Sequence, residues 1–395
     1  MYNITIVLLL VLVLTSYSLV VSGSSGVQCL DENGDKVDWW VIQKQPTLSG
    51  TTGRFLEGLA YSYADEYSET LELSTKWLNA SNTALAYTLA QIYSDSKSDD
   101  MLWIMYNDQL PEEGSSASSD SEESSDGQGP ISSTFAHSKG TLAFKKSNGF
   151  WLIHSTPRFP WDPHQSAYIF PENEVNNGQS FLCVSYDTQD NFDKISTKLF
   201  INRPYIYAYN IPDTSIGVST SVINSLINGD YESSPATDTN ALYSLKGVEF
   251  QVFAKNKQWN QDLYEMLIQP TLNQNMLVTS WRLGANSTIM PTFCTPTYDY
   301  DSVNTMNFVF SGDGSDQYTW RYTKDHSKWA ISFKDAETSY VCIGDINRMY
   351  SQYKRGGGSA CFSNSILWTS YYNTISNAAY CSSSEYKNTV KIINN

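Results

Sequence analysis

Basic side chains are scarce in this 395-residue chain. Lysine and arginine together number 25 against 41 aspartates and glutamates, so the formal net charge is −16 at pH 7. This balance excludes a broad basic surface for nucleic acid at neutral pH. It does not exclude such a partner in an acidic compartment, because many carboxylates approach their reference pKa values near about pH 4.5 and lose charge.

Cysteine is also scarce, with six residues and no Cys-x-x-Cys pair. A zinc site is therefore not expected, and no metal ligands are predicted. An even number of cysteines fits three disulfides in an oxidising compartment, and counting alone leaves all fifteen connectivities open.

Beyond its N-terminus the sequence lacks an apolar run long enough to cross a membrane. The run from Ile4 to Leu14 and the small residues Val21-Ser22-Gly23 predict a signal peptide over residues 1–23. No Lys or Arg precedes the run, and an N-terminal anchor is the alternative. Sequons at Asn79 and Asn286 predict N-glycosylation, which fits a secretory route and no membrane attachment after cleavage.

Histidine is the rarest of the reactive side chains, yet two of the four histidines open the same tripeptide. These are His137-Ser138-Lys139 and His326-Ser327-Lys328. Histidine can be a nucleophile or a proton donor, and a lysine two residues on projects from the same side of an extended strand. Two facing units would form a phosphate clamp with one nucleophile and one acid. Solvent-facing histidines in basic loops are the alternative for either motif alone, and the pair favours the functional interpretation.

The two motifs lie 189 positions apart, close to half of the mature chain. This spacing predicts two halves, residues 24–206 and 207–395, related by duplication or pseudo-twofold symmetry. The stretch 111–130 is crowded with Ser, Gly, Asp and Glu and is predicted to be a disordered acidic insertion. An autoinhibitory phosphate mimic is the alternative role for it.

Both halves alternate strand-like and helix-like segments. Strands are predicted at 39–43, 101–106, 140–144, 150–154, 181–186, 248–254, 277–281, 308–311, 329–333 and 340–344. Helices are predicted at 83–94, 191–200, 220–228 and 261–273. The pattern indicates a mixed α/β (α+β) sandwich in each half, with each His-Ser-Lys directly before a strand.

Several specific motifs follow one another in a fixed order. They are Phe135-Ala136-His137-Ser138-Lys139-Gly140, Gly149 to Pro157, Gly178 to Tyr186, Asp325-His326-Ser327-Lys328-Trp329, Cys342 to Arg348 and Arg355-Gly356-Gly357-Gly358, preceded by Asp38 to Pro46. Together they resemble the deoxyribonuclease II family of acid endonucleases over nearly the whole mature chain. The acidic insertion is the main departure.

That family is similar to phospholipase D enzymes, which implies a pseudo-twofold pair of αβα sandwich halves whose His-x-Lys units meet. Gly344-Asp345-Ile346-Asn347 matches the Gly-x-x-Asn element of these enzymes, whereas the first half has His154-Ser155 in the comparable region. The carboxylate that follows His-x-Lys in phospholipase D has no match after Lys139, so the partner that orients each imidazole stays open. The resemblance implies catalytic roles for His137, Lys139, His154, His326, Lys328 and Asn347, and substrate-binding roles for Arg355 and Ser155. It also implies the disulfides Cys29–Cys183, Cys294–Cys381 and Cys342–Cys361.

The function implied is hydrolysis of DNA at acid pH without a metal or other cofactor. A phosphohistidine intermediate would lead to 3′-phosphate and 5′-hydroxyl ends, with His137 favoured as nucleophile and His326 as acid. DNA is then the partner, no obligate protein partner is expected, and the oligomeric state stays open. The lysosome is the expected destination, with secretion as the alternative. A lipid or nucleotide phosphodiesterase and a non-catalytic secreted binding protein are the competing functions.

Three further residues have competing roles. His154 is expected to take part directly, with a buried core histidine as the alternative because Trp151-Leu152-Ile153 precedes it. His164 is expected to lie in a loop. Trp329 is expected to pack in the core rather than stack on a base.

Overall fold

The computed structural model describes residues 26–111, 131–282, 288–294 and 301–381. The predicted signal peptide, residues 112–130 of the insertion and the sequon at Asn286 lie outside these ranges. Asn79 is exposed in a turn, as a glycosylation site requires. Among the described residues, no helix combines the length and apolar character that a bilayer crossing needs.

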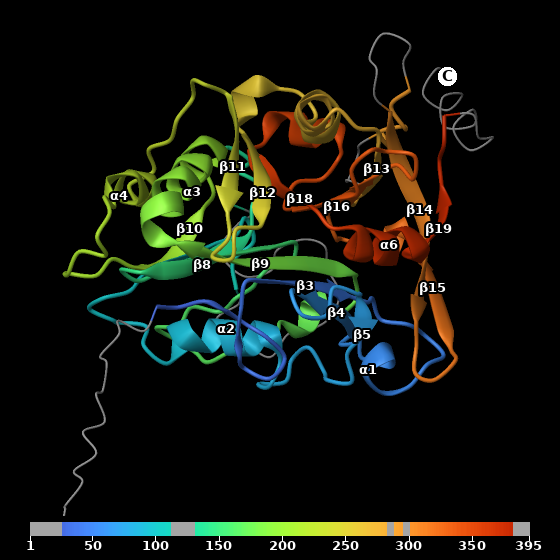
Figure 1. Cartoon of the computed structure of the whole chain (residues 1–395), viewed down its shortest axis with the longest axis horizontal. Helices are drawn as coiled ribbons and strands as arrows, with labels where there is room; N and C mark the ends of the chain where they lie inside the picture. Colours follow the sequence, from blue (N-terminus) through green and yellow to red (C-terminus); the bar gives the residue numbers. More distant parts are fainter. Residues whose placement is uncertain (1–25, 112–130, 283–287, 295–300, 382–395) are drawn as a thin grey trace, which may run out of the picture.

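Two large sheets form the body of the molecule, as the predicted mixed α/β class requires (Figure 1). The first has the order β10-β6-β7-β8-β9-β3-β4-β5 and is antiparallel throughout. Its strands are β3 (Trp39–Lys44), β4 (Tyr61–Asp65), β5 (Glu72–Leu73), β6 (Leu102–Tyr106), β7 (Gly140–Phe144), β8 (Asn148–His154), β9 (Gln179–Asp187) and β10 (Ile206–Asn210). A small ribbon of β1 (Cys29–Leu30) and β2 (Lys36–Val37) precedes them.

The second sheet has the order β11-β12-β18-β17-β16-β13-β14-β15, and β19 also pairs with β14. Only its β13–β14 pair is parallel among the strands of the described ranges. Its strands are β11 (Thr237–Tyr243), β12 (Glu249–Lys255), β13 (Met276–Thr279), β14 (Ser302–Ser311), β15 (Gln317–Arg321), β16 (Trp329–Ser332), β17 (Tyr340–Gly344), β18 (Gly357–Ser363) and β19 (Ile375–Ala378).

Helices lie on both sides of the sheets and between them. They are α1 (Gly53–Leu56), α2 (Ala84–Tyr93), α3 (Thr188–Asn202), α4 (Ser221–Ile227), α5 (Gln269–Leu272) and α6 (Ser365–Thr374), with a π-helix η3 (Tyr264–Ile268) and the 3₁₀ turns η1 (Glu172–Glu174), η2 (Lys257–Trp259), η4 (Tyr322–Lys324) and η5 (Tyr350–Lys354). Side-chain caps start the longer helices: Thr83 begins α2, Asp187 begins α3 and Asn364 begins α6.

The central core lies between the two sheets. Strand β6 shows why: Leu102, Ile104 and Tyr106 point into the central cluster, while Trp103 and Met105 point to the outer face beneath α2. This is the period-two alternation of a strand buried on both faces. The second sheet repeats the pattern, and α3 and α6 add apolar side chains to the same central cluster. Both sheets therefore depend on one shared apolar layer.

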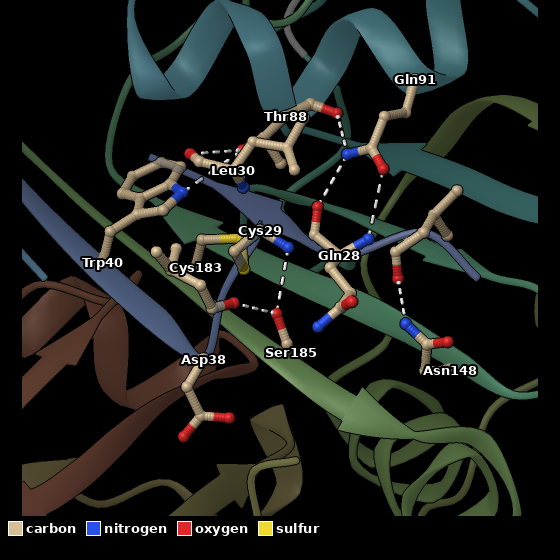
Figure 2. Close-up of a disulfide and its surroundings, with 12 residues drawn as sticks. Gln28, Cys29, Leu30, Asp38, Trp40, Thr88, Gln91, Asn148, Cys183 and Ser185 are labelled. Atoms are coloured by element: carbon tan, nitrogen blue, oxygen red, sulfur yellow. Dashed lines mark hydrogen bonds between the residues drawn. A yellow bond between two sulfur atoms is a disulfide. The ribbon is translucent and has the colours of Figure 1, made fainter. Parts of the chain in front are cut away.

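All three disulfides pair as the family resemblance implied. Cys29–Cys183 fastens the N-terminal ribbon to β9 (Figure 2). Beside it, Ser185 accepts the Cys29 N–H at 3.0 Å and donates to the Val37 carbonyl at 2.7 Å. Gln91 of α2 makes hydrogen bonds to both backbone groups of Gln28, so the ribbon is held from the helix as well (Figure 2).

Strand β10 crosses the predicted boundary at residue 206, because it pairs with β6 of the first sheet through residue 210. Both sheets are otherwise made of chain segments from one side of that boundary. The division into 24–206 and 207–395 stays a prediction.

Candidate active site

Each His-Ser-Lys tripeptide ends where a central strand begins. Lys139 precedes β7 and Lys328 precedes β16, as the sequence predicted. The next strand then returns to the motif: the His154 N–H donates to the Lys139 carbonyl at 3.1 Å, and the Gly344 N–H donates to the Lys328 carbonyl at 2.9 Å. The two motifs therefore occupy matching positions at the ends of their sheets.

The two histidines are tied to each other's sheets through the backbone. The His137 N–H donates to the Gly356 carbonyl at 2.9 Å, and Gly356 directly precedes β18 of the second sheet. The His326 N–H donates to the Gly178 carbonyl at 2.8 Å, and Gly178 directly precedes β9 of the first sheet. These reciprocal bonds bring both motifs to the seam between the sheets.

Side chains also meet across this seam. The Asn347 amide lies 3.3 Å from Nε2 of His137, and the Arg355 guanidinium forms a 3.0 Å ion pair with Asp108. The serines and lysines of both tripeptides are buried, whereas the two histidines are partly exposed. A substrate approaching from solvent would thus meet the imidazoles first.

Asp108 orients the first imidazole. Its carboxylate lies 2.7 Å from Nδ1 of His137 and 2.5 Å from the Lys139 ammonium. Burial alone would raise the pKa of Asp108, but the charges of His137, Lys139 and Arg355 hold it well below its usual value. A carboxylate that stays ionised fixes the proton of His137 on Nδ1 and leaves the Nε2 lone pair free.

The second imidazole has an aromatic neighbour. Strand pairing aligns Tyr106 with Gly140 in the first sheet and Thr279 with Trp329 in the second. Two residues beyond these pairs, the first sheet has Asp108 and the second has Trp281. The Trp281 ring lies 4.3 Å from the His326 ring, at 68° to it. Matching positions thus place a carboxylate beside one histidine and an indole beside the other.

The electrostatics of the second motif differ accordingly. Burial lowers the pKa of His326 to about 3, and the charges of Lys328, His137, Lys139 and Lys44 act in the same direction. Burial and the Lys139 charge lower the pKa of Lys328 to about 7. Burial likewise lowers the pKa of His137 to about 3, against the opposing charge of Asp108. The charges of Lys139 and Lys328 thus add to burial in lowering the pKa of His326, and the same charges suit an anion.

Asp345 and Ser155 occupy equivalent positions in the two sheets, because each directly follows the strand that returns to a His-Ser-Lys motif. Asp345 accepts the Gly358 N–H at 2.8 Å, and the Ser155 hydroxyl accepts the Ser180 N–H at 2.9 Å. Burial raises the pKa of Asp345 to about 7, so it is largely neutral at acid pH.

The other residues named from sequence fall into two groups. Arg355 and Ser155 lie at the site with their polar atoms engaged: Arg355 donates to the Phe135 and Ala136 carbonyls, and Ser155 also donates to Gln179. The His154 ring is fully buried behind Lys139, packed between Phe159 and Phe181. Direct roles for these three stay predictions.

Two structural expectations are confirmed away from the chemistry. His164 lies exposed in a turn, with Nδ1 3.0 Å from Asp162. Trp329 is 1% exposed and packs against Phe308 and Tyr371 in the core.

Sequence reasoning missed Asp108 and Trp281. Asp108 is separated from His137 by the acidic stretch, so nothing local connects them. A usable signal was present, because each residue stands shortly after an apolar strand that must pair with the strand following His-Ser-Lys. Two positions past the strand predicted at 101–106 is Asp108, but the strand predicted at 277–281 already contains Trp281, so the same count from the sequence would have selected only Asp108.

Within the described ranges, one cluster of side chains brings three candidate metal-ligand atoms together: Cys294, Asp301 and Cys381, whose two cysteines are joined in a disulfide. A disulfide has no thiolate to offer, so the cluster does not fit a metal ion. At the seam, one ionised carboxylate faces Lys139, Arg355 and His137, which is not a donor set that favours a cation.

The comparisons with known proteins agree with this geometry. The family model for deoxyribonuclease II matches residues 28–381. Deoxyribonuclease-2 from Caenorhabditis elegans is 35% identical over 356 residues, covering 87% of this chain and 91% of that protein. Plancitoxin-1 from Acanthaster planci is 31% identical, covering 95% and 99%, and deoxyribonuclease-2-alpha from Bos taurus is 30% identical, covering 87% of each. The chain belongs to the deoxyribonuclease II family.

Proposed function

We propose that this protein is an acid endodeoxyribonuclease that cleaves DNA without a metal ion and leaves 3′-phosphate and 5′-hydroxyl ends. The observation that carries the proposal is the reciprocal backbone tie, in which each His-Ser-Lys motif is held by a glycine of the opposite sheet. One site then contains two imidazoles and two lysines. The names of the relatives, deoxyribonuclease-2 among them, support DNA as the substrate.

His137 is the proposed nucleophile. Asp108 holds its Nδ1 proton, so the Nε2 lone pair can form a bond to phosphorus. As the P–N bond forms, the bond from phosphorus to the leaving 5′ oxygen breaks. Asn347, 3.3 Å from Nε2, is placed to donate to a non-bridging oxygen.

His326 is the proposed acid. It gives its proton to the 5′ oxygen, then takes a proton from the water that attacks phosphorus and breaks the P–N bond. Burial lowers its pKa to about 3, and the charges of Lys328, His137 and Lys139 act in the same direction. A bound phosphodiester anion offsets those positive charges and raises the pKa of His326 toward the working range.

The remaining residues stabilise the negative charge of the phosphate. Lys139 and Lys328 neutralise the non-bridging oxygens, which removes the need for Mg²⁺. We propose that this arrangement is a phospholipase D-like pair of halves, since the paired contacts of the two motifs are consistent with a pseudo-twofold axis. Three disulfides fit a secretory route, and we propose the lysosome as the destination.

Cleavage of supercoiled plasmid at pH 5 in EDTA tests the function. The wild-type protein should cut it, while His137→Ala and His326→Ala should each remove nearly all activity and the double variant should be little worse than either. His164→Ala, in an exposed turn, is the matched control. Loss of cleavage in EDTA with recovery in Mg²⁺ would contradict the mechanism, and half-maximal activity in each single variant would indicate two independent sites.

The pH dependence tests the role of His326. Because kcat/KM reports groups of the free enzyme and kcat reports those of the complex, the falling alkaline limb of kcat should lie at higher pH than that of kcat/KM. The reason is the substrate anion, which raises the pKa of His326 from about 3. Steady-state kinetics on a short duplex between pH 3 and 8 gives both limbs. If the alkaline limbs of kcat and kcat/KM lie at the same pH, the substrate anion does not raise the pKa of His326.

A further inference from the structure

Lys44, the last residue of β3, is fully buried and does not end at a carboxylate. Its ammonium donates to three backbone carbonyls: Gln45 at 3.0 Å, Val175 at 2.7 Å and Asn177 at 2.7 Å. Asn177 directly precedes Gly178, whose carbonyl accepts the His326 N–H. One buried lysine therefore fixes the segment that holds one catalytic histidine.

Lys255, the last residue of β12, repeats this arrangement in the second sheet. Its ammonium donates to the carbonyls of Gln352 at 2.9 Å, Tyr353 at 3.0 Å and Arg355 at 2.8 Å. Arg355 directly precedes Gly356, whose carbonyl accepts the His137 N–H. The same chemistry thus occurs twice, each time one residue before the glycine that holds the opposite motif.

We infer that Lys44 and Lys255 are a matched pair of positioning residues, each of which sets the place of the catalytic histidine on the opposite sheet through a glycine carbonyl. The inference rests on the proposed function, because it assigns His137 and His326 to the reaction. Neither lysine touches the substrate in this arrangement. Each acts through three carbonyl bonds and one backbone tie.

The energetics favour a positional role over a purely stabilising one. Burying an ammonium group costs free energy, and carbonyl dipoles repay it only when the geometry is fixed. Three N–H donors on one nitrogen bond three carbonyls of the same loop at once, which favours one well-defined loop conformation. Misplacing a catalytic group by about 1 Å can lower a rate by roughly 10²-fold.

Both groups are charged at acid pH. Burial lowers the pKa of Lys44 to about 7, against the opposing charges of Glu174 and Asp325 that face it. Burial lowers the pKa of Lys255 to about 8, against the charge of Asp262. A neutral amine donates two hydrogen bonds instead of three, so each loop loses one tie as the pH rises through these values.

The two lysines differ in one respect that an experiment can use. Lys44 is the weakest of the main charges that add to burial in lowering the pKa of His326, whereas Lys255 is not among the main influences on either catalytic histidine. Removing Lys44 should therefore both displace His326 and raise its pKa. Removing Lys255 should move His137 without changing the pKa of His326.

The test compares Lys44→Met and Lys255→Met with Lys194→Met, which replaces an exposed lysine on α3. We expect kcat on DNA at pH 5 to fall roughly 10- to 100-fold in the first two variants, with KM changed less than about threefold. Lys194→Met should match wild type. Proton NMR of the four imidazoles gives a readout independent of activity: the pKa of His326 should rise in Lys44→Met and stay unchanged in Lys255→Met.

Folding is checked by near-UV circular dichroism, and Lys44→Arg and Lys255→Arg serve as milder variants that keep the charge. Wild-type kcat in folded Lys44→Met and Lys255→Met would overturn the inference and leave the proposed function intact. Failure of all four variants to fold would assign the lysines to the fold alone, which also overturns it. If the wild-type protein cuts no DNA, the proposed function fails, and the imidazole titrations still decide whether Lys44 acts on His326.

Discussion

At the residue scale, the site is asymmetric at one pair of matching positions. Asp108 and Trp281 stand two residues beyond equivalent strand pairs, and each lies against the histidine of its own sheet. A carboxylate stabilises a fixed tautomer and any positive charge on the ring, whereas the indole packs against the His326 ring and has no charge with which to hold its proton. This difference favours His137 as the base-like nucleophile and His326 as the group that readily gives up a proton.

Asp108→Asn should lower kcat by on the order of 10²- to 10⁴-fold, because an amide can stabilise the wrong tautomer of His137 and cannot stay anionic between Lys139 and Arg355. Steady-state kinetics at pH 5 measures the change. Asp213→Asn, at an exposed position, is the control. A kcat within threefold of wild type would show that the carboxylate does not orient the nucleophile.

At the element scale, the sequence predicted the strands that surround the motifs and the cores of α2, α3 and α4. It did so because the strands are rich in β-branched and aromatic residues and the helices have apolar residues at helical spacing. The elements it missed include β4, β10, β11, β15, β18, β19 and α6. In β10, β11 and β15 half-exposed, polar residues weaken the alternation, and β18 is composed largely of small residues. The helix predicted at 261–273 contains a π-helical turn, a detail that apolar spacing does not encode.

The start of β18 gives a steric prediction. A Cβ at Gly356 would lie 1.9 Å from the Asn202 carbonyl oxygen, and this atom belongs to the backbone. Gly356→Ala must therefore shift the segment whose carbonyl holds His137, so we expect a loss of kcat larger than the loss of thermal stability would explain. Activity at pH 5 and the unfolding midpoint should be measured together. Unchanged activity would mean that the His137 tie tolerates displacement.

At the scale of the whole molecule, composition and motif spacing predicted the class and the convergence of two half-sites. They did not supply Asp108, which lies before the acidic insertion and reaches His137 through the pairing of β6 with β7. The pairing of the disulfides came from family resemblance, since spacing alone left every connectivity open. Contacts between distant segments depend on which strands pair, and the order of the strands in each sheet could not be derived from this single sequence.

Net charge predicts how DNA binding responds to pH and salt. A chain of net charge −16 repels a polyanion less as its carboxylates become protonated, so the optimum should lie between roughly pH 4 and 6. KM for DNA should rise from pH 4.5 to 7.5, and added salt should reduce that rise by screening the repulsion. Kinetics at two ionic strengths measures both effects. Maximal activity at pH 8, or a KM at pH 7.5 that increases with salt, would contradict the argument.

The reciprocal glycine ties also set an order in time. His137 is synthesised before Gly356, and the carbonyl that holds it emerges only with β18, 219 residues later in the chain. A nascent or truncated chain that lacks this strand has its first histidine without a backbone partner. Such a chain would be a poor nuclease while still on the ribosome. The order of the strands would in this way delay cutting activity until β18 has been synthesised and has paired.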